Sequence, residues 1–187
     1  MQMNNIVEQI RSFVEEECKK PSSKYGYEPF VHHFIPMHDF AVKLAEKQNA
    51  DLEIVELAAW LHDIGSIVYG RENHHITSAK IAEEKLREWG YPEKKIEIVK
   101  KCILNHRGSC PGIKESKEEQ IIADADAMSA FEHIEGLFRA AYVSENMNQE
   151  EARKSVLEKF ENCWNKISKE AREIVKNKYE AVMMLLK

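Results

Sequence analysis

The stretch that decides the fold is ELAAWLHDIGSIV, residues 56–68, in which His62 and Asp63 stand at the end of an apolar run. A buried imidazole or carboxylate without partners costs several kcal/mol. Such a pair is stable only where other groups compensate it, either through hydrogen bonds or through a metal ion. The rest of the chain must therefore supply those groups.

Apolar residues recur at helical spacing on both sides of this stretch. They predict helices over roughly 4–19 and 30–48, and a third helix that contains the quoted stretch and has Asp51 as its N-cap. A further helix begins near 74 and ends at Gly90, and Pro92 stands at the start of the next. Residues 65–75, between the third helix and the helix that begins near 74, contain two glycines and no clean helical period. They predict a loop or a short turn of helix.

Two capping signals organise the second half of the chain. Ser116 with Glu119 predicts the start of one long helix that continues to about 143, and Asn148 with Glu151 predicts the start of the next. The tail is predicted to form two amphipathic helices that divide near 166–168 and pack on the bundle. With only 7 glycines and 5 prolines in 187 residues, the chain predicts an all-α bundle in a single domain, 1–187.

Composition excludes several classes of protein. The net charge is −5 with both signs interspersed, so bulk nucleic-acid binding is not expected. The N-terminus lacks a signal-peptide pattern, and no apolar run approaches the roughly 20 residues that span a bilayer. We therefore expect a soluble cytoplasmic protein without a membrane partner, whose terminal helices could support a homodimer. Reduced thiols fit the widely spaced cysteines, Cys18, Cys102, Cys110 and Cys163.

Several histidines stand at predicted helix ends, where a bundle can bring them together. A lone histidine is usually a surface residue or a hydrogen-bonded core group. His33 and His74, however, stand at helix starts, and His62 and His106 at helix ends. The eight histidines of the chain are His32, His33, His38, His62, His74, His75, His106 and His133.

A carboxylate is expected from IIADADAM, residues 121–128, where Asp124 and Asp126 interrupt an apolar helix. Residues two apart on a helix point about 200° apart, so only one of the two can face a given site. The other aspartate is expected to face solvent.

Three of these blocks resemble, in order, those of the HD-domain metal-dependent phosphohydrolases: HFIPMHDFAVKLA, ELAAWLHDIG and IIADADAM. The resemblance covers roughly residues 30–135. HHITSAKIAEE and CILNHRGS resemble insertions in HD subgroups that add two histidines and hold two metal ions. The resemblance implies an HD-domain helical bundle with its metal site between helix ends and His62 and Asp63 in the catalytic centre. The implied ligands are His33, His62, Asp63, His74, His106 and Asp126.

Neighbouring histidines compete with two members of this set. His32 and His38 are the rivals of His33, and His75 is the rival of His74. The register of the following helix face favours His33, and the four-residue step to a small residue favours His74. His133 is expected to be either an outer neighbour of the site or a surface residue.

Imidazole and carboxylate together suit Fe, Mn, Co, Ni or Zn better than Mg²⁺. A bridging Asp63 could hold two ions about 3.5–4 Å apart, which would activate a bound water and polarise a phosphoryl oxygen. The reaction implied is hydrolysis of a phosphoester or phosphoanhydride. By family resemblance, the substrate is a small phosphorylated molecule, a nucleotide or dinucleotide.

Phosphate also needs donors from the protein, and the nearby cations are Arg71, Arg107 and Lys80. Many HD proteins carry a lysine soon after the aspartate of the pair, but Ser66 follows HDIG here. That departure leaves the phosphate contact unassigned, with Arg71 favoured.

Other classes of function remain open. One is a non-catalytic nucleotide-sensing module, and another is an HD-type oxygenase with a dinuclear iron site. A third is a scaffold in which the polar groups only bond one another, although core networks are usually smaller than six ionisable groups. Asp124 and Glu72 could relay protons, but each is expected to face solvent.

Overall fold

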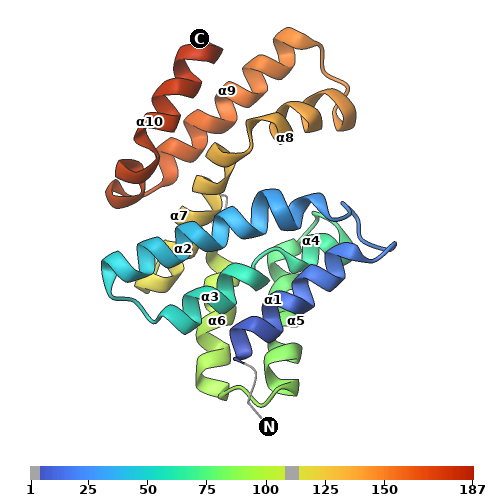
Figure 1. Cartoon of the computed structure of the whole chain (residues 1–187), viewed down its shortest axis with the longest axis vertical. Coiled ribbons are helices and arrows are strands. Elements are labelled where there is room, and N and C mark those ends of the chain that lie inside the picture. Colours follow the sequence, from blue (N-terminus) through green and yellow to red (C-terminus); the bar gives the residue numbers. More distant parts are fainter. Residues whose placement is uncertain (1–4, 108–113) are drawn as a thin grey trace.

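In this computed structural model the described residues, 5–107 and 114–187, form helices and connecting turns without any strand (Figure 1). The all-α prediction is confirmed. The α-helices are α1 (Ile6–Lys19), α2 (Ile35–Gln48), α3 (Leu52–Leu61), α4 (Ile64–Tyr69), α5 (His74–Glu88), α6 (Glu93–Asn105), α7 (Lys117–Ser129), α8 (Ile134–Arg139), α9 (Gln149–Lys166) and α10 (Lys169–Leu186). Shorter turns are η1 (Phe30–Phe34), η2 (Ala130–Glu132) and η3 (Ala140–Ser144).

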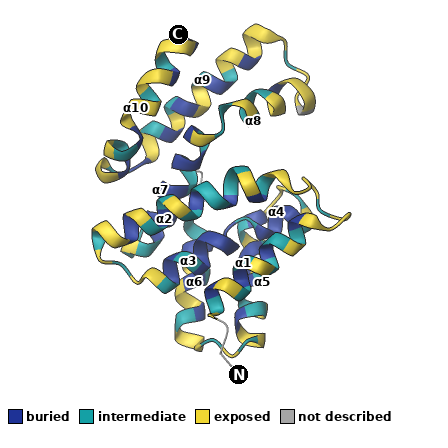
Figure 2. Cartoon of the chain, viewed as in Figure 1, coloured by how far each residue is buried: buried dark blue, intermediate teal, exposed yellow. Residues whose placement is uncertain are grey.

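Helix α3 lies at the centre of the larger group of helices, in contact with α1, α2, α5, α6 and α7. Its residues 57–61 are all buried, and Figure 2 shows this helix largely in the colour of buried residues. A helix that is apolar on every side belongs in a core, and this explains why an uninterrupted apolar run precedes His62. Within the described ranges, no helix is both long and apolar enough to cross a membrane.

Capping side chains set the helix boundaries. Ser116 Oγ accepts a hydrogen bond from the Glu119 amide at 3.2 Å, as predicted. The Glu119 carboxylate, however, binds Asn105 Nδ2 at 2.8 Å, so only half of that capping box forms. The box of Asn148 and Glu151 is complete. These caps fix the starts of α7 and α9, and through Glu119 they tie α7 to the end of α6.

One of two less regular segments agrees with its prediction and the other differs from it. Part of 65–75, predicted to be a loop or a short turn of helix, forms the short helix α4. The long helix predicted to reach 143 instead breaks at His133, whose φ and ψ are −146° and 59°. The His133 ring there lies against Gly136, where an added Cβ would come within 2.2 Å of the imidazole. A side chain at 136 would therefore require the His133 ring to move away from this turn between α7 and α8.

Asp124 corrects another prediction, because it is 1% exposed rather than solvated. Its Oδ1 accepts hydrogen bonds from the Ser168 amide at 3.0 Å and from Gln120 Nε2 at 2.8 Å. Burial raises the pKa of the Asp124 carboxyl. Ser168 precedes α10, so this carboxylate fastens the turn between α9 and α10 to α7. Glu72 is exposed, as expected.

The last three helices form the end of the molecule remote from the N-terminus (Figure 1). Phe131 and Phe160 pack 5.0 Å apart between η2 and α9, and Trp164 stacks on Tyr179 at 4.1 Å. Helices α9 and α10 both contact α7. Three cysteines, Cys18, Cys102 and Cys163, are free and buried, whereas Cys110 lies outside the described residues together with the rest of 108–113 in the predicted loop 105–116.

Candidate metal centre

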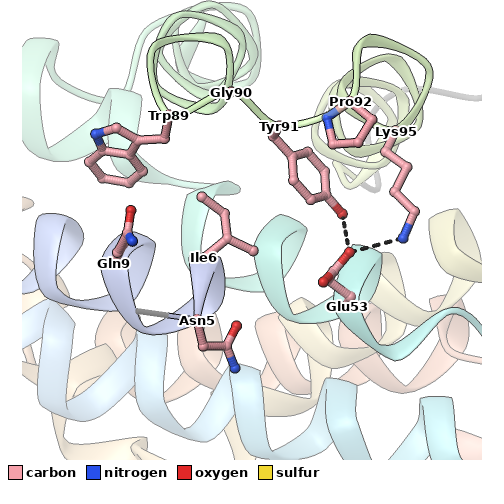
Figure 3. A pocket seen from close by; sticks show the side chains of 9 residues that line it. All are labelled: Asn5, Ile6, Gln9, Glu53, Trp89, Gly90, Tyr91, Pro92 and Lys95. Carbon is pink, nitrogen blue, oxygen red and sulfur yellow. Dashed lines mark hydrogen bonds and ion pairs between the residues drawn. The ribbon is translucent and has the colours of Figure 1, made fainter. Parts of the chain in front are cut away.

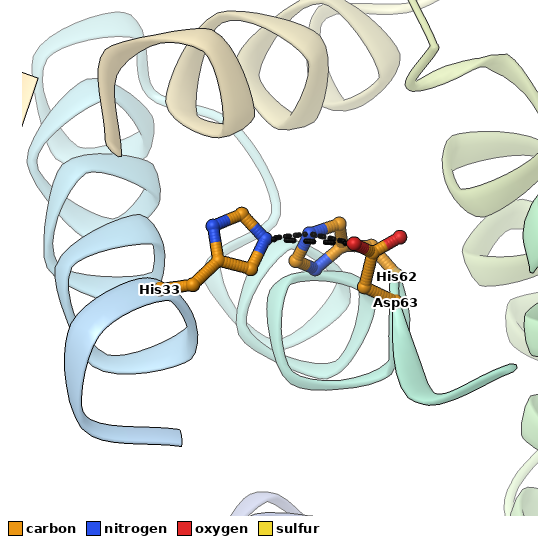
Figure 4. Close-up of side chains that lie close together, drawn as sticks. All are labelled: His33, His62 and Asp63. Atoms are coloured by element: carbon orange, nitrogen blue, oxygen red, sulfur yellow. Dashed lines mark hydrogen bonds and ion pairs between the residues drawn. The ribbon is translucent and has the colours of Figure 1, made fainter. Parts of the chain in front are cut away.

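Helix ends bring the six predicted ligands together. His62 and Asp63 lie in the turn between α3 and α4, His74 is the first residue of α5, and His106 follows α6. The remaining two are His33 in η1 and Asp126 in the last turns of α7. In Figure 4 His33 points across from the α2 side toward His62 and Asp63.

The first group of ligand atoms surrounds one oxygen of Asp63. His33 Nε2 lies 3.0 Å from His62 Nε2 and 3.6 Å from Asp63 Oδ2. Asp126 Oδ1 lies 3.7 Å from His33 Nε2 and 3.8 Å from His62 Nε2. His33, His62 and Asp63 could together hold a cation, and Asp126 lies beside both of these imidazoles.

The second group surrounds the other oxygen of Asp63. His74 Nε2 lies 3.3 Å from His106 Nε2 and 3.0 Å from Asp63 Oδ1, and His106 Nε2 lies 3.6 Å from the same oxygen. Asp63 therefore stands between the two groups and presents one oxygen to each. Both groups have ligand atoms close enough together to hold a metal ion.

Hydrogen bonds fix the ring tautomers of three histidines. In each, Nδ1 lies against the carbonyl oxygen three residues earlier, so we assign the ring hydrogen to Nδ1 and the lone pair to Nε2. The three pairs are His62 with Ala59 at 2.8 Å, His74 with Arg71 at 2.9 Å, and His106 with Ile103 at 2.6 Å. The Nε2 lone pairs of all three point toward the centre.

The six side chains are better suited to bind a metal ion than to hydrogen-bond one another. Neutral Nε2 lone pairs and carboxylate oxygens are all acceptors, and close contacts between them repel. Asp63 Oδ1 is buried and has no hydrogen-bond donor within the described part of the chain. A divalent cation removes this repulsion, and metal-binding histidines commonly donate their other ring nitrogen as these do.

Burial and neighbouring charges shift the pKa values of the individual ligands in different directions. Burial lowers the pKa of His62 to about 4, so this imidazole is neutral at physiological pH. Burial alone would raise the pKa of Asp63, but the surrounding imidazoles, His62 first, bring it well below its usual range. Burial also opposes protonation of His33 and His106, but contact with Asp63 and the charge of Asp126 give both a raised pKa.

The rival histidines lie outside both groups. His32 stacks on His133 with ring centroids 4.3 Å apart and lies 3.2 Å from Glu28. His38 stacks on Trp60 and lies 3.3 Å from Glu56. His75 Nδ1 lies 3.4 Å from Arg107 Nη1. The structure thus separates the six converging residues from the histidines that adjoin them in sequence.

The predicted phosphate contacts differ in position. Arg107 is half-buried next to His106, with its guanidinium beside His75. Arg71 presents an exposed side chain at the loop before α5. Lys80 is exposed on α5, 4.0 Å from Glu84. Arg107 is therefore the most enclosed of the three cations.

Ser129 is a site residue that sequence analysis did not single out. Its Oγ lies 3.0 Å from His33 Nδ1. Helical spacing could have indicated it, because residues 126 and 129 of one helix share a face.

A cavity of about 580 Å³ lies away from these ligands, at the opposite ends of α3, α5 and α6 (Figure 3). Trp89, Tyr91 and Ile6 form its apolar wall, and Glu53 binds the Tyr91 hydroxyl at 2.6 Å and Lys95 Nζ at 2.9 Å. Glu53 lies near the start of α3, whereas the ligands follow its end. This cavity is therefore separate from the metal centre.

These observations define an all-α protein with a histidine and aspartate centre between helix ends. Residues 30–130 match the HD domain family, and the chain belongs to that family.

Solved structures share the fold. Bacillus subtilis YpgQ is 22% identical, with 96% of this chain and 93% of YpgQ covered at a TM-score of 0.72. An HD-superfamily hydrolase from Bacillus thuringiensis is 18% identical, with 97% and 93% covered at a TM-score of 0.73. Both likenesses extend over nearly the whole of each chain.

Among curated proteins, a tRNA (cytidine(56)-2'-O)-methyltransferase of Thermoplasma volcanium is 32% identical over 127 residues. The match covers 62% of this chain and 36% of that protein. The chain spans less than two thirds of the length of the curated relatives it matches.

Proposed function

We propose that the chain is a metal-dependent phosphohydrolase that cleaves a phosphoester or phosphoanhydride bond of a small molecule, a nucleotide or dinucleotide. The observation that carries this proposal is the convergence of four imidazoles on the two oxygens of Asp63, with Asp126 beside two of them. Membership of the HD-domain family also supports metal-dependent hydrolysis at this site.

The proposed ligands divide into two sets that share Asp63. One set is His33, His62, Asp63 and Asp126, and the other is Asp63, His74 and His106. Bound divalent transition-metal ions (Fe, Mn, Co, Ni or Zn) would supply Lewis acidity to a phosphoryl oxygen and lower the pKa of a water. The chain's own part is to direct four imidazoles and two carboxylates at that position.

Arg107 is the proposed contact for the substrate phosphate. Its half-buried guanidinium makes no ion pair with a carboxylate in the described ranges, and its neighbour His75 has a pKa lowered by burial and by the charge of Arg107. An arginine can hold a phosphate through two parallel hydrogen bonds, so a bound phosphate would both neutralise and position it. Arg71 could add a second contact from the loop before α5.

Nucleotides are the first substrates to test. YpgQ, which shares the fold, was crystallised in complex with ADP. The enclosed Arg107 suits a polyphosphate because charge-assisted hydrogen bonds to phosphate are the strong ones.

The test is hydrolysis by metal-stripped protein reloaded with Mn²⁺, Co²⁺ or Zn²⁺, assayed on nucleotides and dinucleotides by product separation. We expect product formation by the wild type, loss in His62→Ala, and retention in His38→Ala, which removes a histidine outside the site. Binding of metal and nucleotide with the nucleotide returned intact would contradict hydrolysis and indicate a sensing module. Oxygen consumption by the iron-loaded protein would instead indicate the oxygenase.

A further inference from the structure

We propose that Ser129 is the positioning residue of His33. Metal binding by one of the two ligand sets, the one that contains His33, then depends on the last turn of α7. The proposal rests on the proposed function only in taking the six residues as metal ligands.

His33 is held differently from the other three histidines. His62, His74 and His106 each bond a backbone carbonyl three residues earlier, which no side-chain substitution can remove. The equivalent carbonyl for His33 is that of Phe30, which accepts the Ile35 amide as η1 passes into α2. His33 Nδ1 turns instead to a side chain of another helix, Ser129 Oγ at 3.0 Å.

The direction of this hydrogen bond follows from the second contact of the serine. Ser129 Oγ donates its only hydrogen to the Asp126 carbonyl oxygen at 2.7 Å. Toward His33 the hydroxyl oxygen can therefore only accept, so His33 Nδ1 carries the ring hydrogen. This leaves the Nε2 lone pair directed at His62 Nε2 and Asp63 Oδ2, where a metal would bind.

Burial makes the serine hard to replace by water. Ser129 is 3% exposed, so removal of its hydroxyl would leave the His33 Nδ1–H without an acceptor. The ring could then recover a partner only by turning or by moving its hydrogen to Nε2, and either change withdraws the lone pair from the metal. Asp126 belongs to the same turn and the same set, so α7 supplies both a ligand and the group that orients its neighbour.

The first experiment compares Co²⁺ binding to Ser129→Ala, Ser129→Thr and Ser116→Ala by isothermal titration calorimetry. Ser116→Ala is the matched control, because it removes a capping hydroxyl from the other end of the same helix. In Ser129→Ala we expect one of two sites to weaken by about 10–100-fold, the usual effect of removing a partner of a ligating histidine. Ser129→Thr should restore it, and Ser116→Ala should match the wild type. Unchanged affinities in Ser129→Ala, or equal weakening at both sites, would overturn the proposal.

The second experiment needs neither a variant nor activity. Nitrogen-15 NMR of the histidine rings in metal-free wild-type protein at pH 9 should show His33 with its hydrogen on Nδ1. A hydrogen on Nε2 would overturn the proposal even if every substitution impaired folding. If instead the Ser129 effects appear but no phosphorylated compound is hydrolysed, the proposed function fails and the positioning role of Ser129 stands.

Discussion

Asp124 and Asp126 are two buried or half-buried carboxylates on opposite sides of one helix, and their surroundings are opposite. Asp124 Oδ1 receives an amide hydrogen from Ser168 and another from Gln120, whereas its Oδ2 is buried without a donor among the described residues. Asp126 faces the Nε2 atoms of His33 and His62, which are acceptors. A buried carboxylate that accepts hydrogen bonds stabilises the folded state, whereas a carboxylate surrounded by other acceptors is stable only when a cation binds between them.

The comparison predicts its largest effect at Asp63, which lies between both groups of acceptors. Asp63→Asn should abolish binding of two metal ions and lower kcat/KM at least about 100-fold, beyond the usual effect of an outer neighbour of a metal. Metal analysis and steady-state kinetics measure both quantities.

The same substitution, Asp63→Asn, should not lower the stability of the metal-free protein, although it lowers metal binding. The new amide can donate to His74 Nε2, which lies 3.0 Å from the Asp63 oxygen. The metal-free variant should therefore unfold at a urea concentration no lower than that of the wild type. A clear loss of stability without metal would mean that Asp63 already has donors and that the acceptor-only description is wrong.

His74 tests whether the centre holds two ions. His74→Ala should reduce the metal content of protein purified without chelator from about two ions per chain to about one, because the second set loses one of its three ligands. His75→Ala is the matched control, since that ring lies next in sequence but outside both groups. One ion per chain in all three proteins would leave a mononuclear site made of His33, His62, Asp63 and Asp126.

On the other side of α7, the expected effect is on stability alone. Asp124→Ala leaves the Ser168 amide without its acceptor, which should lower the free energy of unfolding by about 1–3 kcal/mol. Metal content should stay at the wild-type value, because the Asp124 side chain has no ligand histidine among its hydrogen-bond partners. Urea unfolding and metal analysis on the same preparation separate the two; a loss of metal at unchanged stability would reverse the roles assigned to the two aspartates.

The signals that sequence analysis could use were local. The residues that converge stand at predicted helix ends, and helical register distinguished His33 from His38. Asp124 was misplaced because Ser168, the residue that buries it, lies 44 positions further along the chain. No local pattern shows which face of α7 a later turn will cover, so solvent was the wrong expectation for the aspartate that faces away from the site.

The break at His133 was missed for a related reason. The apolar spacing continues without interruption through residues 121–138, as a single helix would require. At the end of α7 the Ser129 hydroxyl bonds the Asp126 carbonyl, and beyond it the His133 ring lies close to Gly136. Both are contacts of particular side chains, which periodicity does not record.

The smallest effect is expected from pH, and it sharpens the comparison of the two aspartates. Burial raises the pKa of Asp124 in the folded protein above its unfolded value, so the folded state binds the proton more tightly. The stability linked to that proton is fully present below the unfolded pKa, about 3.9, and is lost as pH rises through the folded pKa.

Asp124→Asn keeps an acceptor for the Ser168 amide and carries no charge, so it cannot lose stability in this way. We expect the variant to equal the wild type near pH 4 and to be the more stable of the two at pH 7, measured by urea unfolding of metal-free protein. A variant less stable than the wild type at pH 7 would show that the charged carboxylate strengthens its bonds to Ser168 and Gln120 by more than burial costs it.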